Sequence, residues 1–273
     1  MPTRRSSGPL LGVILDWAGT TVDFGCRAPV EAFRATFRDR DVEITTSEAR
    51  APMGLNKRDH LRAITRMARV AAAWKERHGR PPDESDVDSM YEAFLPIQLG
   101  CIREHADLID GTLDAIAAFR ARGLKIGTTT GYSRAMIDVL LPLAERQGYR
   151  PDAVACASDA AHGRPAPDLV WLNAMTLGLY PLSRAIKIGD TVADIDEGRN
   201  AGMWTIALAK CGNEVGLSRD EAAALPAREL TARVSAAKRK LGAAGAHYVV
   251  ESIADTISLI DIIETRLAAG DRP

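Results

Sequence analysis

The chain has 273 residues, 46% of them hydrophobic, which is enough apolar material for one sizeable domain and a smaller one. Its 35 basic and 36 acidic residues are spread along the chain and give a formal net charge of -1. This balance excludes a broad basic surface for nucleic acid or an anionic membrane. No apolar run approaches the roughly 20 residues of a membrane span. The opening MPTRRSSGP is followed by no signal-type apolar region, so we expect a cytoplasmic protein.

Six short apolar runs predict strands, the first of them the stretch LLGVILD. A continuous run rich in branched residues favours a strand that is covered on both faces of a parallel sheet. Helical patterns that close with glycine lie between most of these runs. This alternation predicts a doubly wound α/β core. The predicted strands cover residues 10–16, 124–130, 152–158, 185–190, 204–209 and 247–252, and the helical patterns between them include 111–123, 134–148 and 167–178.

Residues 25–105 interrupt this alternation, because their patterns are helical without strands. An insert of this size after the first strand predicts a helical cap domain, with residues 1–24 and 106–273 forming the core domain. We expect the cap to cover the carboxyl edge of the sheet, where ligands of open α/β sheets bind.

The four cysteines, Cys26, Cys101, Cys156 and Cys211, form no CxxC pair. Their wide spacing argues against a zinc site and against a disulfide framework. We expect most of them to be buried as small apolar residues. Cys26 is the exception to follow, because it comes soon after the first predicted strand.

Three aspartates follow predicted strands. Asp16 ends the first run, and GDTVAD places Asp190 directly after another run, with Asp194 four residues later. Because the carboxyl ends of parallel strands share one edge, these carboxylates can meet there. Such an oxygen-rich cluster suits Mg²⁺.

Two further elements suit an anion such as a phosphoryl group. In TTTGYS, Thr130 ends a strand with a hydroxyl, and Gly131 allows backbone NH groups to come close to an anion. In HGRPAPDLVW, Arg164 precedes a helix bounded by proline and offers a fixed cation. Each of these elements alone is weak evidence for a phosphoryl site, since an ordinary exposed arginine or a helix-capping aspartate would give the same sequence.

Their order along the chain, DxxGT, then the threonine, the basic residue and GDxxxD, resembles the haloacid dehalogenase superfamily over essentially the whole length. That resemblance implies that Asp16 is a nucleophile that forms an aspartyl-phosphate. Phosphatases of the superfamily usually carry a second aspartate two residues later, as the acid for the leaving alcohol oxygen. Here that residue is Ala18, which cannot transfer a proton. Either this is an unusual phosphatase, or the leaving group is not an alkoxide.

The segment PMGLNKRDHLRAI supports the second possibility. Met53, Lys57 and His60 lie at i, i+4 and i+7, which predicts one helical face. A lysine taken at random is most often solvated. When a C–P bond breaks next to an aldehyde, however, a lysine imine accepts the electrons as an enamine, and no acid is needed at position 18.

With DWAGTTVDFG and MGLNK, the chain resembles the phosphonoacetaldehyde hydrolase family of that superfamily. The resemblance implies cleavage of phosphonoacetaldehyde to acetaldehyde and phosphate, in the degradation of 2-aminoethylphosphonate, by a homodimer joined through its caps. It also implies an imine on Lys57, with His60 as a proton shuttle, and substrate contacts by Thr130, Gly131, Arg164, Met53, Cys26 and Tyr132. The implied Mg²⁺ site consists of Asp16, Ala18, Asp190 and Asp194.

Three alternatives remain open on the sequence. A Mg²⁺-dependent phosphatase or phosphomutase would share the core motifs, but Ala18 counts against it. A haloacid dehalogenase attacks carbon without Mg²⁺ and would leave Asp190 and Asp194 without a role. A binding or regulatory protein would need none of the core motifs, all of which are intact.

Overall fold

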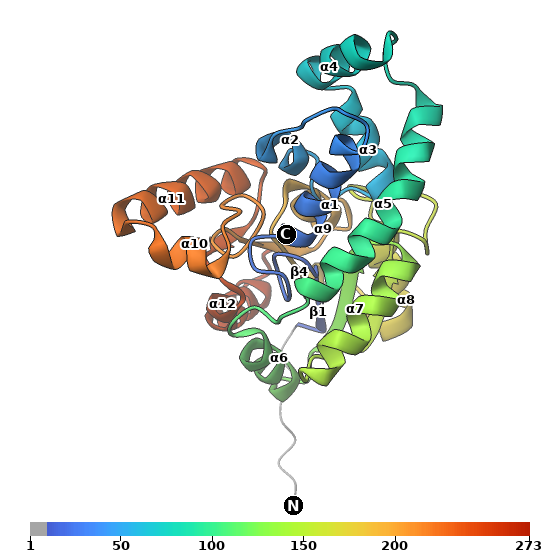
Figure 1. Cartoon of the computed structure of the whole chain (residues 1–273). Coiled ribbons are helices and arrows are strands. Elements are labelled where there is room, and N and C mark those ends of the chain that lie inside the picture. Colours follow the sequence, from blue (N-terminus) through green and yellow to red (C-terminus); the bar gives the residue numbers. More distant parts are fainter. Residues whose placement is uncertain (1–9) are drawn as a thin grey trace, which may run out of the picture.

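Figure 1 shows the computed structural model of the chain. Six parallel strands form one sheet in the order β3-β2-β1-β4-β5-β6. Each strand lies within one of the six apolar runs of the sequence, and the predicted doubly wound fold is confirmed. The strands are β1 (Gly12–Leu15), β2 (Lys125–Thr130), β3 (Ala153–Cys156), β4 (Ala185–Gly189), β5 (Trp204–Leu208) and β6 (Tyr248–Val250).

The structure describes residues 10–273. Two predictions concern the remaining stretch, the absence of a signal-type segment and the start of the core domain at residue 1, and both lie outside the described residues. Among the described helices, none combines the length and the apolar character that crossing a membrane requires.

Strand β1 lies at the centre of the sheet, and all four of its residues are buried. Leu15 pairs with Thr128 of β2 on one side and with Ile188 of β4 on the other. The chain moves outward in one direction from β1 to β2 and β3, and then crosses back to β4. The order in which strands are added therefore reverses between β1 and β4. Such a switch point opens a crevice at the carboxyl ends of the strands.

Connections between parallel strands are almost always right-handed, so the two halves of a doubly wound sheet place their helices on opposite faces. Helix α8 packs against β2 and β3, and α9 packs against β4 and β5. Helix α6 packs against β2 and also contacts α12. The helices of this part are α6 (Thr112–Ala121), α7 (Arg134–Arg146), α8 (Asp168–Leu177), α9 (Val192–Asn200), α10 (Arg219–Ala224), α11 (Ala227–Ala243) and α12 (Thr256–Ala268), with short 3₁₀ turns η1 (Leu182–Arg184) and η2 (Ile253–Asp255).

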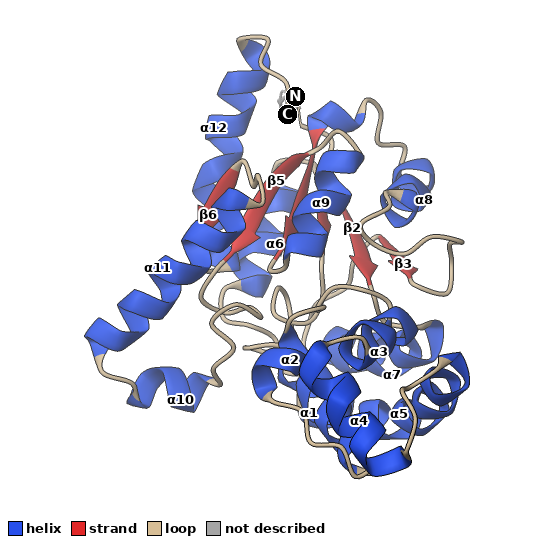
Figure 2. Cartoon of the chain, turned by 90° about the horizontal axis from the view of Figure 1, so that it is seen from above, coloured by secondary structure: helices blue, strands red, loops and turns tan. Residues whose placement is uncertain are grey.

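Five helices between β1 and α6 make up the predicted cap. In Figure 2 the arrowheads of the strands point toward this group, which lies beyond the carboxyl edge of the sheet. The longest of them, α5, packs against α1, α3 and the core helix α7. The five helices are α1 (Arg27–Arg38), α2 (Thr46–Arg50), α3 (Lys57–Thr65), α4 (Ala68–His78) and α5 (Glu84–Glu104).

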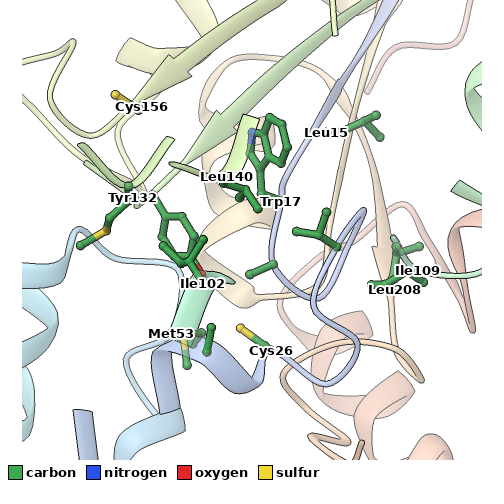
Figure 3. Packing of buried hydrophobic residues seen from close by; sticks show 14 of the residues in the cluster. Leu15, Trp17, Cys26, Met53, Ile102, Ile109, Tyr132, Leu140, Cys156 and Leu208 are labelled. Carbon is green, nitrogen blue, oxygen red and sulfur yellow. The ribbon is translucent and has the colours of Figure 1, made fainter. Parts of the chain in front are cut away.

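One apolar cluster continues from the sheet into the cap. It includes Leu15 and Trp17 at the end of β1, Tyr132 from the loop after β2, and Met53 and Ile102 from the cap segment (Figure 3). All five side chains are at least 90% buried. Because burial of apolar surface contributes about 25 cal/mol per Å², this shared cluster stabilises the cap against the core.

Candidate active site

Asp16 directly follows β1, and its backbone NH donates to the carbonyl of Ile188 at 2.9 Å. That bond extends the pairing of β1 with β4 by one residue and fixes the backbone position from which the Asp16 side chain extends. The side chain is buried, and its Oδ1 lies 2.8 Å from Nη1 of Arg164. Burial raises the pKa of Asp16 to about 6, with a further contribution from the Asp194 carboxylate and partial compensation by Arg164. The carboxylate is therefore oriented by a cation at the switch point of the sheet.

Asp190 follows β4 and completes a cluster with Asp16 and Asp194, in which one oxygen of each lies within 4.8 Å of the others. Its Oδ1 accepts a hydrogen bond from Thr20 Oγ1 at 3.0 Å, and its Oδ2 accepts from the backbone NH of Asn213 at 2.7 Å. Burial, together with the neighbouring carboxylates, raises the pKa of Asp190 well above its usual range. Three carboxylates held this close need a cation to be ionised together.

Asp194 lies in the first turn of α9, where Thr191 caps the helix and donates to Asp194 Oδ2 at 2.6 Å. Its Oδ1 lies 2.8 Å from Arg164 Nη1 and 2.9 Å from Lys187 Nζ. Burial opposes ionisation here, but Arg164 and Lys187 together lower the pKa of Asp194 to about 2. Asp194 is thus ionised and already paired with two cations.

Lys187 and Glu197 belong to the site but were not identified from the sequence. Lys187 Nζ lies 2.8 Å from Thr129 Oγ1 and 3.1 Å from Glu197 Oε2, and both charged side chains are fully buried. Arg164 also donates to the Thr129 carbonyl at 2.6 Å. A signal was present, because a lysine inside the apolar run AIKIGD is unusual and must find a partner in the interior.

The charges of this buried group fit a divalent cation. When all four carboxylates, those of Asp16, Asp190, Asp194 and Glu197, are ionised, they exceed the two buried cations Arg164 and Lys187 by two negative charges. A buried excess of this size is very unfavourable without a counter-charge. Carboxylate oxygens are also the ligands that Mg²⁺ prefers. The residues present therefore fit the predicted metal.

A small cavity of about 20 Å³ lies above the carboxylates, between the cap and the core. The predicted phosphate-binding residues Thr130, Gly131 and Arg164 all line it. Thr130 Oγ1 accepts from the backbone NH of Tyr132 at 3.1 Å, which shapes the loop after β2. The full lining is Asp16, Ala18, Cys26, Pro29, Met53, Gly54, Lys57, Thr130, Gly131, Tyr132, Arg164 and Thr191.

Lys57 is the first residue of α3 and extends its side chain to this cavity. Asn56 caps the helix by accepting from the backbone NH of Asp59 at 2.9 Å. Nζ lies 4.9 Å from the ring centre of Tyr132 and 5.6 Å from that of Phe33. Among the described residues the amine has no hydrogen bond and no ion pair. Burial lowers the pKa of Lys57 to about 8, which favours the neutral, nucleophilic amine.

The prediction that Met53 shares a helical face with Lys57 is wrong. Helix α2 ends at Arg50, and a turn follows in which Gly54 adopts a φ of 97°, so Met53 lies before the helix. A residue other than glycine rarely adopts this conformation, which explains the break. Met53 nevertheless lines the cavity beside Cys26 and Tyr132, and Figure 3 shows the three side chains gathered where cap and core meet.

His60 lies on α3 as predicted but is not among the residues that line the cavity. Its ring stacks on Phe33 with 3.8 Å between the ring centres, and Nε2 lies 2.8 Å from the carbonyl of Ala49. Because a carbonyl can only accept, Nε2 carries the proton. Burial, with a contribution from Lys57, holds the pKa of His60 well below its usual range. The histidine is therefore neutral and supports Phe33, one of the rings that surround Lys57.

The four cysteines are free, as the sequence predicted, and all but the half-buried Cys101 are buried. Cys26 alone among them lines the cavity. It precedes α1 with a φ of 53°, a left-handed conformation that is uncommon for a residue with a side chain. Burial raises the pKa of its thiol well above the usual range, so Cys26 contacts the cavity as an apolar thiol.

The strand order, an aspartate directly after β1 and the carboxylates that follow β4 are typical of the class of haloacid dehalogenase-like hydrolases. The family model of these hydrolases matches residues 11–202 of the chain.

Closer relatives identify the family within this class. The chain is 50% identical to a phosphonoacetaldehyde hydrolase from Syntrophobacter fumaroxidans, over 98% of this chain and 96% of that protein. It is 49% identical to a phosphonoacetaldehyde hydrolase from Nitratidesulfovibrio vulgaris, over 99% and 97%. The crystal structure of a phosphonoacetaldehyde hydrolase-like protein from Oleispira antarctica has a TM-score of 0.96 at 40% identity, over 98% and 97%. The chain belongs to the phosphonoacetaldehyde hydrolase family.

Proposed function

We propose that this protein hydrolyses the C–P bond of phosphonoacetaldehyde to give acetaldehyde and phosphate. The observation that carries the proposal is the amine of Lys57, which is buried and unpaired among the described residues and lines the same small cavity as Asp16. Ala18, which also lines that cavity, supplies no acid for an alkoxide leaving group. The names of the relatives support the same substrate.

The cavity divides into a polar part for the phosphonate and a less polar part for the aldehyde. We assign Thr130, Gly131 and Arg164 to the phosphoryl oxygens, because they supply a hydroxyl, a backbone edge and a cation. We assign Lys57 to the aldehyde carbon, with contacts from Tyr132, Met53 and Cys26. These roles are our proposal for the residues that line the cavity.

The reaction begins when neutral Lys57 adds to the aldehyde and water leaves, giving an iminium ion. Asp16 then attacks phosphorus in line with the C–P bond, and the bonding electrons move into the iminium group to form an enamine. The enamine takes a proton at carbon. One water hydrolyses the aspartyl-phosphate and another hydrolyses the imine, so substrate and one net water yield acetaldehyde and phosphate.

We propose that Mg²⁺ is held by Asp16 and Asp190 with the backbone carbonyl of Ala18, and that Asp194 supports them. Asp194 takes this place because its oxygens already pair with Arg164, Lys187 and Thr191. When bound, the ion neutralises the buried carboxylates and the phosphoryl oxygens. His60 as a proton shuttle and a homodimer joined through the caps are proposals from the family resemblance alone. The domain boundaries at residues 25 and 105 and a cytoplasmic location are proposals from the sequence pattern.

An assay with two matched substrates tests the proposed function. Phosphonoacetaldehyde and glycolaldehyde phosphate differ by one bridging oxygen, so only the ester has an alkoxide leaving group. We expect phosphate and acetaldehyde in equal amounts from the phosphonate, and turnover of the ester that is lower by roughly a hundredfold or more, since a missing general acid typically costs about 10²–10⁴. Faster turnover of the ester would favour the phosphatase alternative, and release of neither product would contradict both.

Thermal unfolding tests the metal site without an activity measurement. The uncompensated carboxylates should bind Mg²⁺ in the native state only, so at 100 times its Kd the ion should add about 2.7 kcal/mol of stability. For a chain of this size, each kcal/mol raises Tm by about 2–4 °C. We expect the increase to be lost with chelator and to be much smaller in Asp190→Asn. An equal Tm with Mg²⁺ and with chelator would show that the cluster does not hold the ion.

A further inference from the structure

Arg50 joins the cap to the core at a point outside the cavity. It is the last residue of α2, and its guanidinium extends to the loop that follows β5. Nη1 donates to the carbonyl of Gly25 at 2.8 Å and to Asn213 Oδ1 at 3.1 Å, and Nη2 donates to the carbonyl of Gly216 at 2.9 Å. One side chain of the cap thus donates hydrogen bonds to three residues on two segments at the base of the cap.

The loop that Arg50 holds lies directly on Asp190. Asn213 donates from its backbone NH to Asp190 Oδ2 at 2.7 Å, and from its side-chain Nδ2 to the carbonyl of Arg50 at 3.3 Å. Gly212 packs so closely that a Cβ atom there would lie 2.3 Å from Cβ of Asp190. The loop therefore has no space to shift on one side without moving the carboxylate or losing its hydrogen bond.

The cap also contacts the other side of Asp190. Gly54, in the turn before Lys57, lies against Thr191, where an added Cβ would be 2.6 Å from Oγ1. Thr191 is the next residue after Asp190 and caps α9. The cap thus contacts two residues that adjoin Asp190: Asn213, whose NH donates to its carboxylate, and Thr191, the next residue in the chain.

We infer that Arg50 is a positioning residue that couples closure of the cap to the orientation of the Asp190 carboxylate, with Asn213 as the link. The inference rests on the proposed function, because it assumes that Asp190 binds the metal. With the cap seated, Arg50 fixes the Asn213 loop, and the loop NH fixes Asp190. Lys57 reaches the cavity from the same cap, so the amine and the carboxylate take their positions together.

The coupling predicts weaker metal binding when the bridge is broken, even without substrate. We expect Arg50→Gln and Asn213→Ala each to raise the Kd for Mg²⁺ roughly tenfold in calorimetric titration, since groups that orient metal ligands typically contribute 10–100-fold. The double variant should bind no more weakly than either single variant, because both changes break one bridge. Arg50→Lys keeps the charge but not the forked donors and should bind with an intermediate Kd.

Arg34→Gln is the matched control. Arg34 belongs to α1 and lines a surface cleft together with Arg50 and Asn213. It is exposed, and its side chain has no hydrogen bond or ion pair with any described residue. We expect it to match the wild type in Mg²⁺ affinity and in turnover of phosphonoacetaldehyde. Circular dichroism and Tm identify any variant that fails to fold, and Asn213→Ala is the milder of the two changes.

Three results would overturn the inference. Wild-type Mg²⁺ affinity in folded Arg50→Gln and Asn213→Ala would show that the bridge does not act on Asp190, and so would losses that simply add in the double variant. A loss of the same size in Arg34→Gln would point to general surface charge. In each of these cases, turnover of phosphonoacetaldehyde by the wild-type protein would still support the proposed function. Absence of both Mg²⁺ binding and turnover in the wild type would overturn both.

Discussion

Replacing Lys57 with arginine is expected to abolish hydrolysis of phosphonoacetaldehyde, on the order of a thousandfold or more in kcat/KM. Guanidinium keeps the positive charge but stays protonated, so it cannot add to the aldehyde. Lys57→Met is the matched control for size, because it leaves a flexible chain without a charge. Since the Lys57 amine has no ion-pair partner among the described residues, neither change should lower Tm strongly.

Borohydride trapping gives the same prediction a direct chemical readout. Reduction during turnover should inactivate the wild type and leave a stable adduct on the peptide that contains Lys57, visible by mass spectrometry. The arginine variant should stay unmodified at that position, and the wild type should stay unmodified without substrate. Full turnover in borohydride with no adduct, or near-normal activity of Lys57→Arg, would refute the imine and favour the phosphatase alternative.

The pH dependence of the wild type follows from the same amine. Because burial lowers the pKa of Lys57 from 10.5 to about 8, the neutral fraction at pH 7 rises from less than about one in a thousand to about one in ten. The neutral form is the nucleophile, so kcat/KM should rise with pH up to about 8 and then level off. A rate that falls across this range would contradict a neutral-amine mechanism.

The fold was predictable because its signals are local. Each strand is a short apolar run, and each of Asp16, Thr130 and Asp190 stands at the end of one. In a parallel sheet the ends of strands meet at one edge, so residues far apart in sequence could be assigned to one site before any contact was known. Membership of the phosphonoacetaldehyde hydrolase family, predicted from the same motifs, is confirmed.

The parts that were missed depend on contacts between distant segments. Glu197 and Lys187 matter because each is buried against the other, and sequence spacing does not show which polar residues a fold encloses. His60 has the helical spacing of a cavity residue, but Phe33 covers its ring. For Met53 the signal was available, since Pro52 and Gly54 favour a turn over a continuous helix.

Ala18→Asp is expected to lower kcat/KM for phosphonoacetaldehyde by about a hundredfold. Ala18 is buried and lines the cavity with Asp16, so an aspartate there places a further negative charge close to the Asp16 carboxylate. Two like charges about 5 Å apart repel by about 3 kcal/mol at an effective dielectric constant near 20. Such a loss of transition-state stabilisation corresponds to about two orders of magnitude in rate. The new carboxylate also occupies space beside the C–P bond.

Ala18→Asn separates charge from space, because asparagine has nearly the size of aspartate and no charge. We expect it to retain more activity on phosphonoacetaldehyde than Ala18→Asp, by roughly tenfold, if repulsion between carboxylates is the larger effect. Both variants should be assayed on glycolaldehyde phosphate as well, where only aspartate can act as the acid for an alkoxide. Equal losses in the two variants would assign the role of Ala18 to space alone. If Ala18→Asp kept full C–P cleavage and also turned over the ester well, the alanine would not be an adaptation to a carbon leaving group.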